Sequence, residues 1–505
     1  MTVSDLQLVV HFALCSRILT VLFQMVFNSL IPDHRADAFQ APQLHSLSIG
    51  DALLEIVLGG FSRWDAQHFL FIAEFGYIYE HNFAFLPLFP VSLRAMAETV
   101  LRPLQWLLNL HSRLLLAAVL LNMLIFVLSA VLLYQLGVVV LQDRRLASLS
   151  SLLFCLTPAN VFMSAAYSES MFVLLVFSGM LHLEKGRPLI SCILFSLSTA
   201  VRSNGIVNAG FLFYSQLRHC SLYVRHKLKV TEKDSYKSWF NLVLRSVLLV
   251  ATGIVMIMLP FVLFQCYGYL MFCKSTVNPA LDIPQPLLQL ARDKGYRVPD
   301  KDSMLPSWCH HRYPIIYTYI QDTYWNVGFL RYYQLCQLPN FLLAFPVVAL
   351  GVWAVWQYVC ADPWYCIQLG LGCRKLKEET EEDSKPLSSF YRHRLFVYIV
   401  HMTVLLAFGI CFMHIQVVTR FLASSSPILY WFTAHLLQEV EPGHLAQDST
   451  TSPLPYKFGI FPRNQLTALL WDWRGCSLTV RCVLGYFLLY WFLGLALHCN
   501  FLPWT

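Results

Sequence analysis

Long apolar segments recur along the whole chain and constrain its fold more than any other feature. Hydrophobic residues occupy 57% of the 505 positions and charged residues only 13%, about half the charged fraction of an ordinary soluble protein. Several segments are long enough to cross a bilayer, because a helical span needs about 20 mostly apolar residues. The sequence therefore predicts an all-α polytopic membrane protein rather than a soluble domain.

The apolar segments predict about eleven transmembrane helices, with an error of two either way, in one integral-membrane domain over residues 1–505. The first segment, residues 6–30, lacks a small-residue cleavage motif. We therefore expect a retained signal anchor rather than a removed signal peptide. The other expected spans are residues 114–140, 146–162, 165–183, 188–201, 205–218, 241–268, 335–358, 395–413, 421–439 and 479–499.

Two hydrophilic stretches are expected on the lumenal side. Residues 31–113 are interrupted by prolines and charges, which predicts a large first lumenal loop with helices lying along the membrane surface. A transmembrane helix at about 83–101 is the alternative, and it would invert the orientation of everything that follows. Residues 270–328 form the second stretch, which we place in the lumen although its own basic residues make the charge rule ambiguous.

Charge and cysteine spacing do not indicate nucleic acid or metal binding. The net charge of +7 is spread over many loops, as in membrane proteins with basic cytosolic loops. The 15 cysteines form no CxxC pair, so we expect neither a zinc site nor a disulfide framework. Cys309-His310-His311 is a candidate ligand group, but ordinary loop residues are favoured. Asp300-Lys301-Asp302 matches the metal-binding DxD pattern of soluble glycosyltransferases, yet no βαβ pattern surrounds it, which favours a solvated loop.

The segment RWDAQHFLFIAEFGYIYEHNFAFLPLFP, residues 63–90, carries ionisable side chains among aromatic residues and prolines. Such groups at a membrane boundary are costly unless they face water, one another or a substrate. Asp65 is the candidate general base, because one carboxylate can take a proton from an acceptor hydroxyl. Arg63 is a candidate phosphate contact, Trp64 a sugar-stacking face, and His68 a substrate ligand. The structural alternative is that Asp65 pairs with Arg63 or caps a helix.

Three further polar breaks supply candidate substrate-binding residues. Glu169, in YSES, lies beside or within an apolar helix and could orient a substrate hydroxyl. Arg202 and Asn204, in RSNG, combine a planar cation with an amide, which suits a phosphate. Gln416 and Arg420, in HIQVVTRF, form the third break, where the arginine could hold a lipid phosphate. Structural alternatives stay open: Arg202 would pair with Glu169, and Arg420 would extend to the lipid headgroups.

Taken in order from Arg63 to Thr505, these segments, with QLPNFLLAFP and the terminal NFLPWT, resemble the PIG-V family. The resemblance implies a glycosyltransferase of the GT-C superfamily in the endoplasmic reticulum (ER) membrane, with an essential acidic residue in the first lumenal loop. Asp65 matches that position. The implied reaction is inverting transfer of mannose from dolichyl-phosphate-mannose to the first mannose of a glycosylphosphatidylinositol (GPI) precursor, in α1,6 linkage, in the lumen. No cofactor or metal is expected.

Other interpretations stay open beside this resemblance. A dolichyl-phosphate-sugar transferase of the same architecture could use a different acceptor. A non-catalytic polytopic transporter or scaffold belongs to another class, although the clustering of ionisable residues toward one face favours chemistry at a membrane surface. The expected partners are the two glycolipids and ER membrane lipid, with an accessory membrane subunit as a further candidate and no nucleic acid.

Overall fold

The computed structural model describes residues 3–42, 44, 47–228, 235–274, 283–299, 305–372, 389–440, 464–502 and 504. Regular secondary structure in these residues is helical, without a β-strand, which confirms the all-α class. The prediction for residues 300–302 lies outside the described residues.

Within the described residues, six helices are long and apolar enough to cross a membrane. They are α1 (Val3–Leu30), α5 (Leu110–Leu141), α10 (Ser235–Cys273), α13 (Leu338–Ala361), α15 (Phe396–Phe412) and α20 (Leu478–His498). Each corresponds to one of the predicted spans, so the polytopic class is confirmed.

The predicted count of about eleven spans is not confirmed, because the five other segments form shorter or more polar helices. Interruptions of the α-helical backbone divide these segments. The first lies between residues 156 and 168, and the others lie at Arg202 and Ser426. The resulting helices are α6 (Arg144–Cys155), α7 (Glu169–Glu184), α8 (Pro188–Val201), α9 (Ala209–Leu228), α16 (Val418–Ser425) and α17 (Ile428–Val440).

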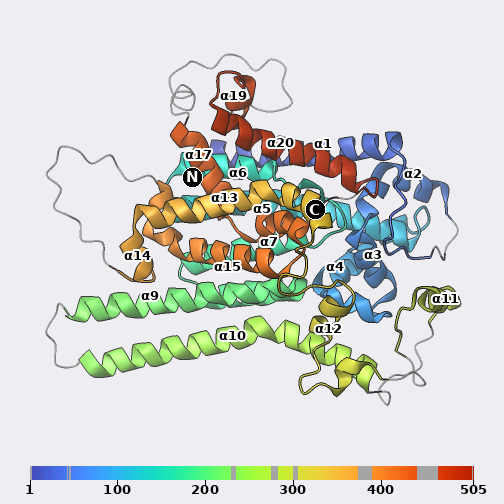
Figure 1. Ribbon diagram of the computed structural model, residues 1–505, viewed down its shortest axis with the longest axis horizontal. Coiled ribbons are helices and arrows are strands. Elements are labelled where there is room, and N and C mark those ends of the chain that lie inside the picture. Colours follow the sequence, from blue (N-terminus) through green and yellow to red (C-terminus); the bar gives the residue numbers. More distant parts are fainter. Residues whose placement is uncertain are drawn as a thin grey trace.

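Helix α5 lies in the core of the bundle and packs against α1, α6 and α7. Its buried face consists mainly of Leu, Ala and Val side chains. The long helices run roughly side by side, with α1 and α20 along one edge and α9 and α10 along the opposite edge (Figure 1). This packing creates a rigid frame for the segments that join the helices.

Short helices between the first two long ones gather at one end of the bundle (Figure 1). They are α2 (Ile49–Leu58), α3 (Asp65–Phe75) and α4 (Leu88–Glu98). A capping box starts α2, in which the Ser48 hydroxyl accepts from the Asp51 amide and the Asp51 carboxylate accepts from the Ser48 amide. Helix α4 has 11 residues, about 16 Å of helix, and is therefore too short to cross a membrane at residues 83–101.

A disulfide joins Cys273, at the end of α10, to Cys309. Cys309 lies in the 3-10 turn η6 (Ser307–His310), and this pair was missed by the expectation that the chain has no disulfide framework. The disulfide also removes Cys309 from the candidate metal group. Spacing alone did not reveal the pair, because 36 residues separate two cysteines that the fold brings to a Cα separation of 5.6 Å.

Side-chain contacts join the two hydrophilic stretches into one unit. Glu80, in the 3-10 turn η2 (Glu80–Ala84), is buried. Its carboxylate accepts hydrogen bonds from Trp308 Nε1 at 2.8 Å and from the Tyr324 hydroxyl at 3.0 Å. Tyr324 directly follows α12 (Ile316–Thr323). The second stretch therefore packs against the segment that follows Asp65.

Candidate active site

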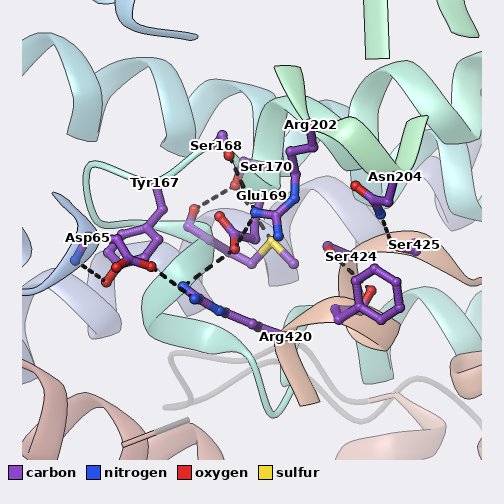
Figure 2. Close-up of polar contacts among 12 residues, drawn as sticks. Asp65, Tyr167, Ser168, Glu169, Ser170, Arg202, Asn204, Arg420, Ser424 and Ser425 are labelled. Atoms are coloured by element: carbon purple, nitrogen blue, oxygen red, sulfur yellow. Dashed lines mark hydrogen bonds and ion pairs between the residues drawn. The ribbon is translucent and has the colours of Figure 1, made fainter. Parts of the chain in front are cut away.

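Four charged side chains from distant parts of the chain meet in one row with alternating sign (Figure 2). Arg420 Nη2 lies 2.9 Å from Asp65 Oδ2, and Arg420 Nη1 lies 3.9 Å from Glu169 Oε1. Arg202 Nη1 lies 2.6 Å from the same oxygen of Glu169. The structure thus brings together the candidate base and two of the three arginines, Arg202 and Arg420, that the sequence singled out as phosphate contacts.

A strained turn positions Asp65 at the start of α3. The preceding residue, Trp64, has φ 58° and ψ −129°, a conformation that is costly for a residue with a Cβ and that concentrates at functional sites. The hydroxyl of Tyr167 accepts the Asp65 backbone N–H at 3.2 Å. The first turn of α3 is therefore held by a side chain from the loop before α7.

Glu169 occupies the first position of α7, where the free N–H groups of a helix favour negative charge. The loop that leads to it is held by Asn122 on α5, whose Nδ2 donates to the carbonyls of Ala165 and Tyr167 at 2.6 and 3.0 Å. Ser170 Oγ donates to the Met163 carbonyl. Glu169 is therefore fixed in place by the frame of the bundle.

The four charges differ in their access to solvent. The Asp65 side chain is 31% exposed, those of Arg202 and Arg420 are 19% and 15% exposed, and Glu169 is fully buried. Glu169 lies behind the two arginines as their buried countercharge. Its expected contact with a substrate hydroxyl stays a prediction.

Electrostatics keep Asp65 ionised. Burial alone would raise its pKa, but Arg420, His68 and Arg202 together bring the pKa of Asp65 below its ordinary value of 3.8. Arg420 contributes both its charge and a hydrogen bond of 2.9 Å. Asp65 is therefore a carboxylate at neutral pH, and its basicity is restrained for as long as Arg420 holds it.

Arg63 is directed toward other partners than Asp65. It pairs with Asp33 at 3.0 Å and with Glu55 at 3.2 Å, and its guanidinium lies over the ring of Phe501. The structural alternative in which Arg63 neutralises Asp65 is therefore not what the structure adopts. A phosphate contact by Arg63 would require it to leave these carboxylates, and it stays a prediction.

The four remaining candidates lie in four different settings. The ring of Trp64 packs near Phe501, with centroids 5.9 Å apart. The ring of His68 is stacked between two aromatic rings. Asn204 Nδ2 donates to Ser425 Oγ at 3.1 Å, which ties the turn after α8 to α16 beside Arg420 (Figure 2). Gln416 accepts from the Tyr332 hydroxyl at 3.1 Å, so it belongs to a separate pair.

Sequence reasoning missed Tyr167 and His498. Besides the Asp65 amide, the Tyr167 hydroxyl contacts His498 Nε2 at 3.2 Å, and the Arg420 guanidinium lies 5.6 Å from the Tyr167 ring centroid. A histidine at the end of the last apolar helix was a usable signal, because an ionisable residue inside such a helix is uncommon. Tyrosine carries no comparable signal in a chain with 24 of them.

No group of three or more His, Cys, Asp or Glu side chains in the described part of the chain is placed to hold a metal ion. The site combines a carboxylate with two guanidinium groups. Such a set can accept a proton at one end and hold a phosphate at the other.

Comparison with known proteins identifies a family. The model of the mannosyltransferase family PIG-V matches residues 6–505. "GPI alpha-1,6-mannosyltransferase 2" of Mus musculus is 52% identical over 502 residues, 98% of each chain. The protein of that name from Homo sapiens is 50% identical over 507 residues, again 98% of each chain.

A more distant relative agrees with this assignment. "GPI mannosyltransferase 2" of Drosophila melanogaster is 32% identical over 84% of this chain and 90% of its own. The oligosaccharyltransferase AglB from Archaeoglobus fulgidus, solved with an inhibitory peptide and a dolichol-phosphate, aligns at a TM-score of 0.42 and 10% identity, covering 96% of this chain and 56% of that chain; this similarity is too low to carry an argument. The match over nearly the full length shows that the chain belongs to the PIG-V family of mannosyltransferases.

Proposed function

We propose that this protein transfers mannose from dolichyl-phosphate-mannose to the 6-hydroxyl of the first mannose of a GPI precursor, forming an α1,6 linkage in the ER lumen. The names of the mammalian relatives support the acceptor and the linkage. The observation that carries the proposal is the partly exposed pair of Asp65 and Arg420. It places a proton acceptor beside a cation in a row of four charges of alternating sign.

The two arginines would hold the donor phosphate. Both reach solvent, and a guanidinium binds phosphate oxygens in a planar, bidentate manner. In the absence of donor their charge is balanced by Asp65 and Glu169. An incoming phosphate competes with Asp65 for Arg420, and the loss of that ion pair raises the pKa of Asp65. Donor binding would therefore make Asp65 a stronger base at the moment it is needed.

Asp65 would take the proton from the acceptor 6-hydroxyl as that oxygen attacks the anomeric carbon. The bond to the phosphate oxygen breaks, and the dolichyl phosphate leaves with the electron pair. Attack opposite the leaving group inverts the β-linked donor to an α product. A phosphate leaves without strong acid assistance, so stabilisation of its charge by Arg202 and Arg420 contributes most.

Two observations support a lumenal position for the site. The disulfide Cys273–Cys309 belongs to the stretch that packs around Glu80, and disulfides persist in the oxidising ER lumen rather than in the cytosol. Basic residues cluster where α5 meets α6 and where the chain enters α15, at the end opposite α3 and α4 (Figure 1), as the positive-inside rule expects of a cytosolic side. They include Arg144, Arg145, Arg392 and Arg394, and Lys185 and Arg187 lie between α7 and α8.

The decisive experiment uses detergent-purified protein with dolichyl-phosphate-mannose and a synthetic GPI acceptor bearing one mannose. We expect a product with a second, α1,6-linked mannose. A lack of transfer by pure protein that is restored by membrane extract would favour a scaffold or a required accessory subunit. Transfer to another dolichol-pathway acceptor, with the one-mannose GPI left unchanged, would overturn the acceptor assignment.

A further inference from the structure

A group of buried polar atoms without hydrogen-bond partners lies next to Asp65. His81 is 3% exposed and Asn82 is fully buried. Among the described residues, both ring nitrogens of His81, both amide atoms of Asn82 and Nδ1 of His68 have no hydrogen-bond partner. The Asn82 side chain acts as a hydrogen-bond partner that raises the pKa of His68, although the contact is not a well-formed hydrogen bond. Natural proteins rarely leave so many buried polar atoms unpaired in one place.

The group is adjacent to the proposed base. His68 follows Asp65 by three positions on α3, which places the two on the same face of the helix. The charge of Asp65 acts on the pKa of His68. The ring of His81 lies 5.4 Å from that of His68, centroid to centroid. A ligand that met these polar atoms would therefore have its hydroxyl groups next to the carboxylate.

Aromatic rings surround the polar atoms. His68 is stacked between Phe39 and Phe85, at centroid separations of 4.4 and 4.8 Å. The ring of Tyr296 lies 4.5 Å from that of His81, and the ring of Trp325 lies 6.4 Å from that of His68. Apolar and aromatic walls with a few convergent polar groups are typical of a small-molecule site. Sugars match this composition, because they combine apolar C–H faces with hydroxyl groups.

Both histidine rings are neutral at neutral pH, a state in which they can bind sugar hydroxyl groups. Burial lowers the pKa of His68 to about 4 and that of His81 to about 3, although the charge of Asp65 partly opposes the shift at His68. Each neutral ring therefore offers one donor and one acceptor at neutral pH. An amide adds both kinds of group, and a sugar hydroxyl can satisfy either kind.

We propose that His81 and Asn82, together with the edge of His68, form a subsite that binds hydroxyl groups of the acceptor mannose and presents its 6-hydroxyl to Asp65. This inference rests on the proposed function and names the part of the protein that recognises the acceptor. Turn η2 carries both residues, and Glu80 anchors that turn to Trp308 and Tyr324. The subsite therefore forms only where the two hydrophilic stretches meet.

The test replaces the polar atoms and keeps the shape, with His81→Phe and Asn82→Leu. Each variant should raise the acceptor KM by about tenfold, the value of one lost hydrogen bond, and leave the donor KM unchanged. Thermal stability should stay equal or rise, because each change removes buried unpaired polar atoms. A matched control is His401→Phe, since His401 on α15 is a buried histidine with an unpaired Nδ1 that contacts Phe211 instead. That control should leave both KM values unchanged.

Each outcome decides the inference. Unchanged acceptor KM with equal or higher stability would assign the polar atoms to ordered water and overturn the subsite. Loss of activity in proportion to lost folded protein would assign them a structural role and also overturn it. If wild-type protein transfers no mannose at all, the proposed function fails by itself. Direct binding of the one-mannose acceptor to wild-type protein and to the two variants then still tests the subsite.

Discussion

Arg17 and Arg420 are both arginines held inside a mostly apolar protein, but their partners differ in charge. Arg17 on α1 is fully buried, and its described partners are neutral. It donates to Asn160 Oδ1 at 2.5 Å and to Ser164 Oγ at 2.7 Å, and it lies 3.7 Å over the ring of Phe126. Arg420 is partly exposed and is held by the carboxylates of Asp65 and Glu169.

This difference separates a structural cation from an exchangeable one. The neutral oxygens to which Arg17 donates belong to the turn η4 (Asn160–Met163) and the loop that leads to Glu169. Arg17 is fully buried, so it does not connect them to solvent. A charged carboxylate at a partly exposed arginine can be replaced by a phosphate without leaving the cation unpaired. Arg17 therefore shapes the loop, whereas Arg202 and Arg420 remain available to a ligand.

The largest effect that tests this comparison is expected from Asp65→Asn. The amide keeps the shape but cannot take a proton, so transfer should fall by about 10²–10⁴-fold, with little change in thermal stability. Rates are measured on purified protein with saturating donor and acceptor. The matched control is Asp322→Asn, at an exposed carboxylate that pairs with Arg331, and it should transfer normally. Activity of Asp65→Asn near that of wild type would remove Asp65 as the base.

The next largest effects are expected from conservative substitutions of the two exchangeable arginines, Arg202 and Arg420. Arg420→Lys and Arg202→Lys keep the charge but lose the planar pair of donors. Each should raise the donor KM by about 10–100-fold, as expected for one charge-assisted hydrogen bond, while the acceptor KM changes little. Arg331→Lys, at an exposed ion pair, is the control. An effect confined to the acceptor KM would contradict the assignment of these arginines to the phosphate.

Arg17→Met should act on stability rather than on substrate binding. The change removes the donor to Ser164 Oγ and leaves Asn160 Oδ1 with the Thr20 hydroxyl at 3.2 Å, which should lower the free energy of unfolding by about 1–3 kcal/mol. Thermal denaturation in detergent measures the loss, and both KM values of the folded fraction should stay near those of wild type. Arg94→Met, at an exposed i,i+4 pair with Glu98, should change stability far less. A raised donor KM in Arg17→Met would instead make Arg17 part of the site.

The charged members of the site could be predicted from the sequence because ionisable residues are conspicuous in an apolar chain. Asp65, Glu169, Arg202 and Arg420 were all identified in this way, and the structure brings them together. The pair of Arg202 and Glu169 stood among the structural alternatives, but the pair of Asp65 and Arg420 could not be predicted, since 355 positions separate the two residues. The helical pattern likewise does not reveal which partner a side chain meets across the bundle.

Fold predictions succeeded where one apolar segment forms one helix. The predicted bounds 188–201 agree with those of α8, and those of the long spans agree within six residues at each end. They failed where breaks shorten the helices, because hydropathy averages over the turn between α6 and α7 and over the break between α16 and α17. The disulfide and the contacts of His81 and Asn82 arise from tertiary packing, which apolar periodicity does not encode.

Acidification should produce the smallest and most selective difference in stability between the site around Asp65 and the surroundings of Arg17. His68 and His81 have folded-state pKa values of about 4 and about 3, below the ordinary 6.5. The unfolded chain therefore binds more protons between pH 6.5 and 4, and stability should fall as the pH drops through that window. Asp65, whose pKa is lowered from 3.8, adds its loss only below that value.

The contacts of Arg17 involve no carboxylate or histidine, so they add no acid sensitivity in this range. Thermal melts at pH 7, 5 and 4 compare wild type with His81→Phe and Arg17→Met. His81→Phe should lose less stability than wild type on acidification, because it removes one of the buried histidines whose pKa the fold lowers. Arg17→Met should start lower and decline in parallel with wild type. A steeper decline in Arg17→Met would mean that its surroundings titrate, and the separation between a fixed and an exchangeable arginine would then fail.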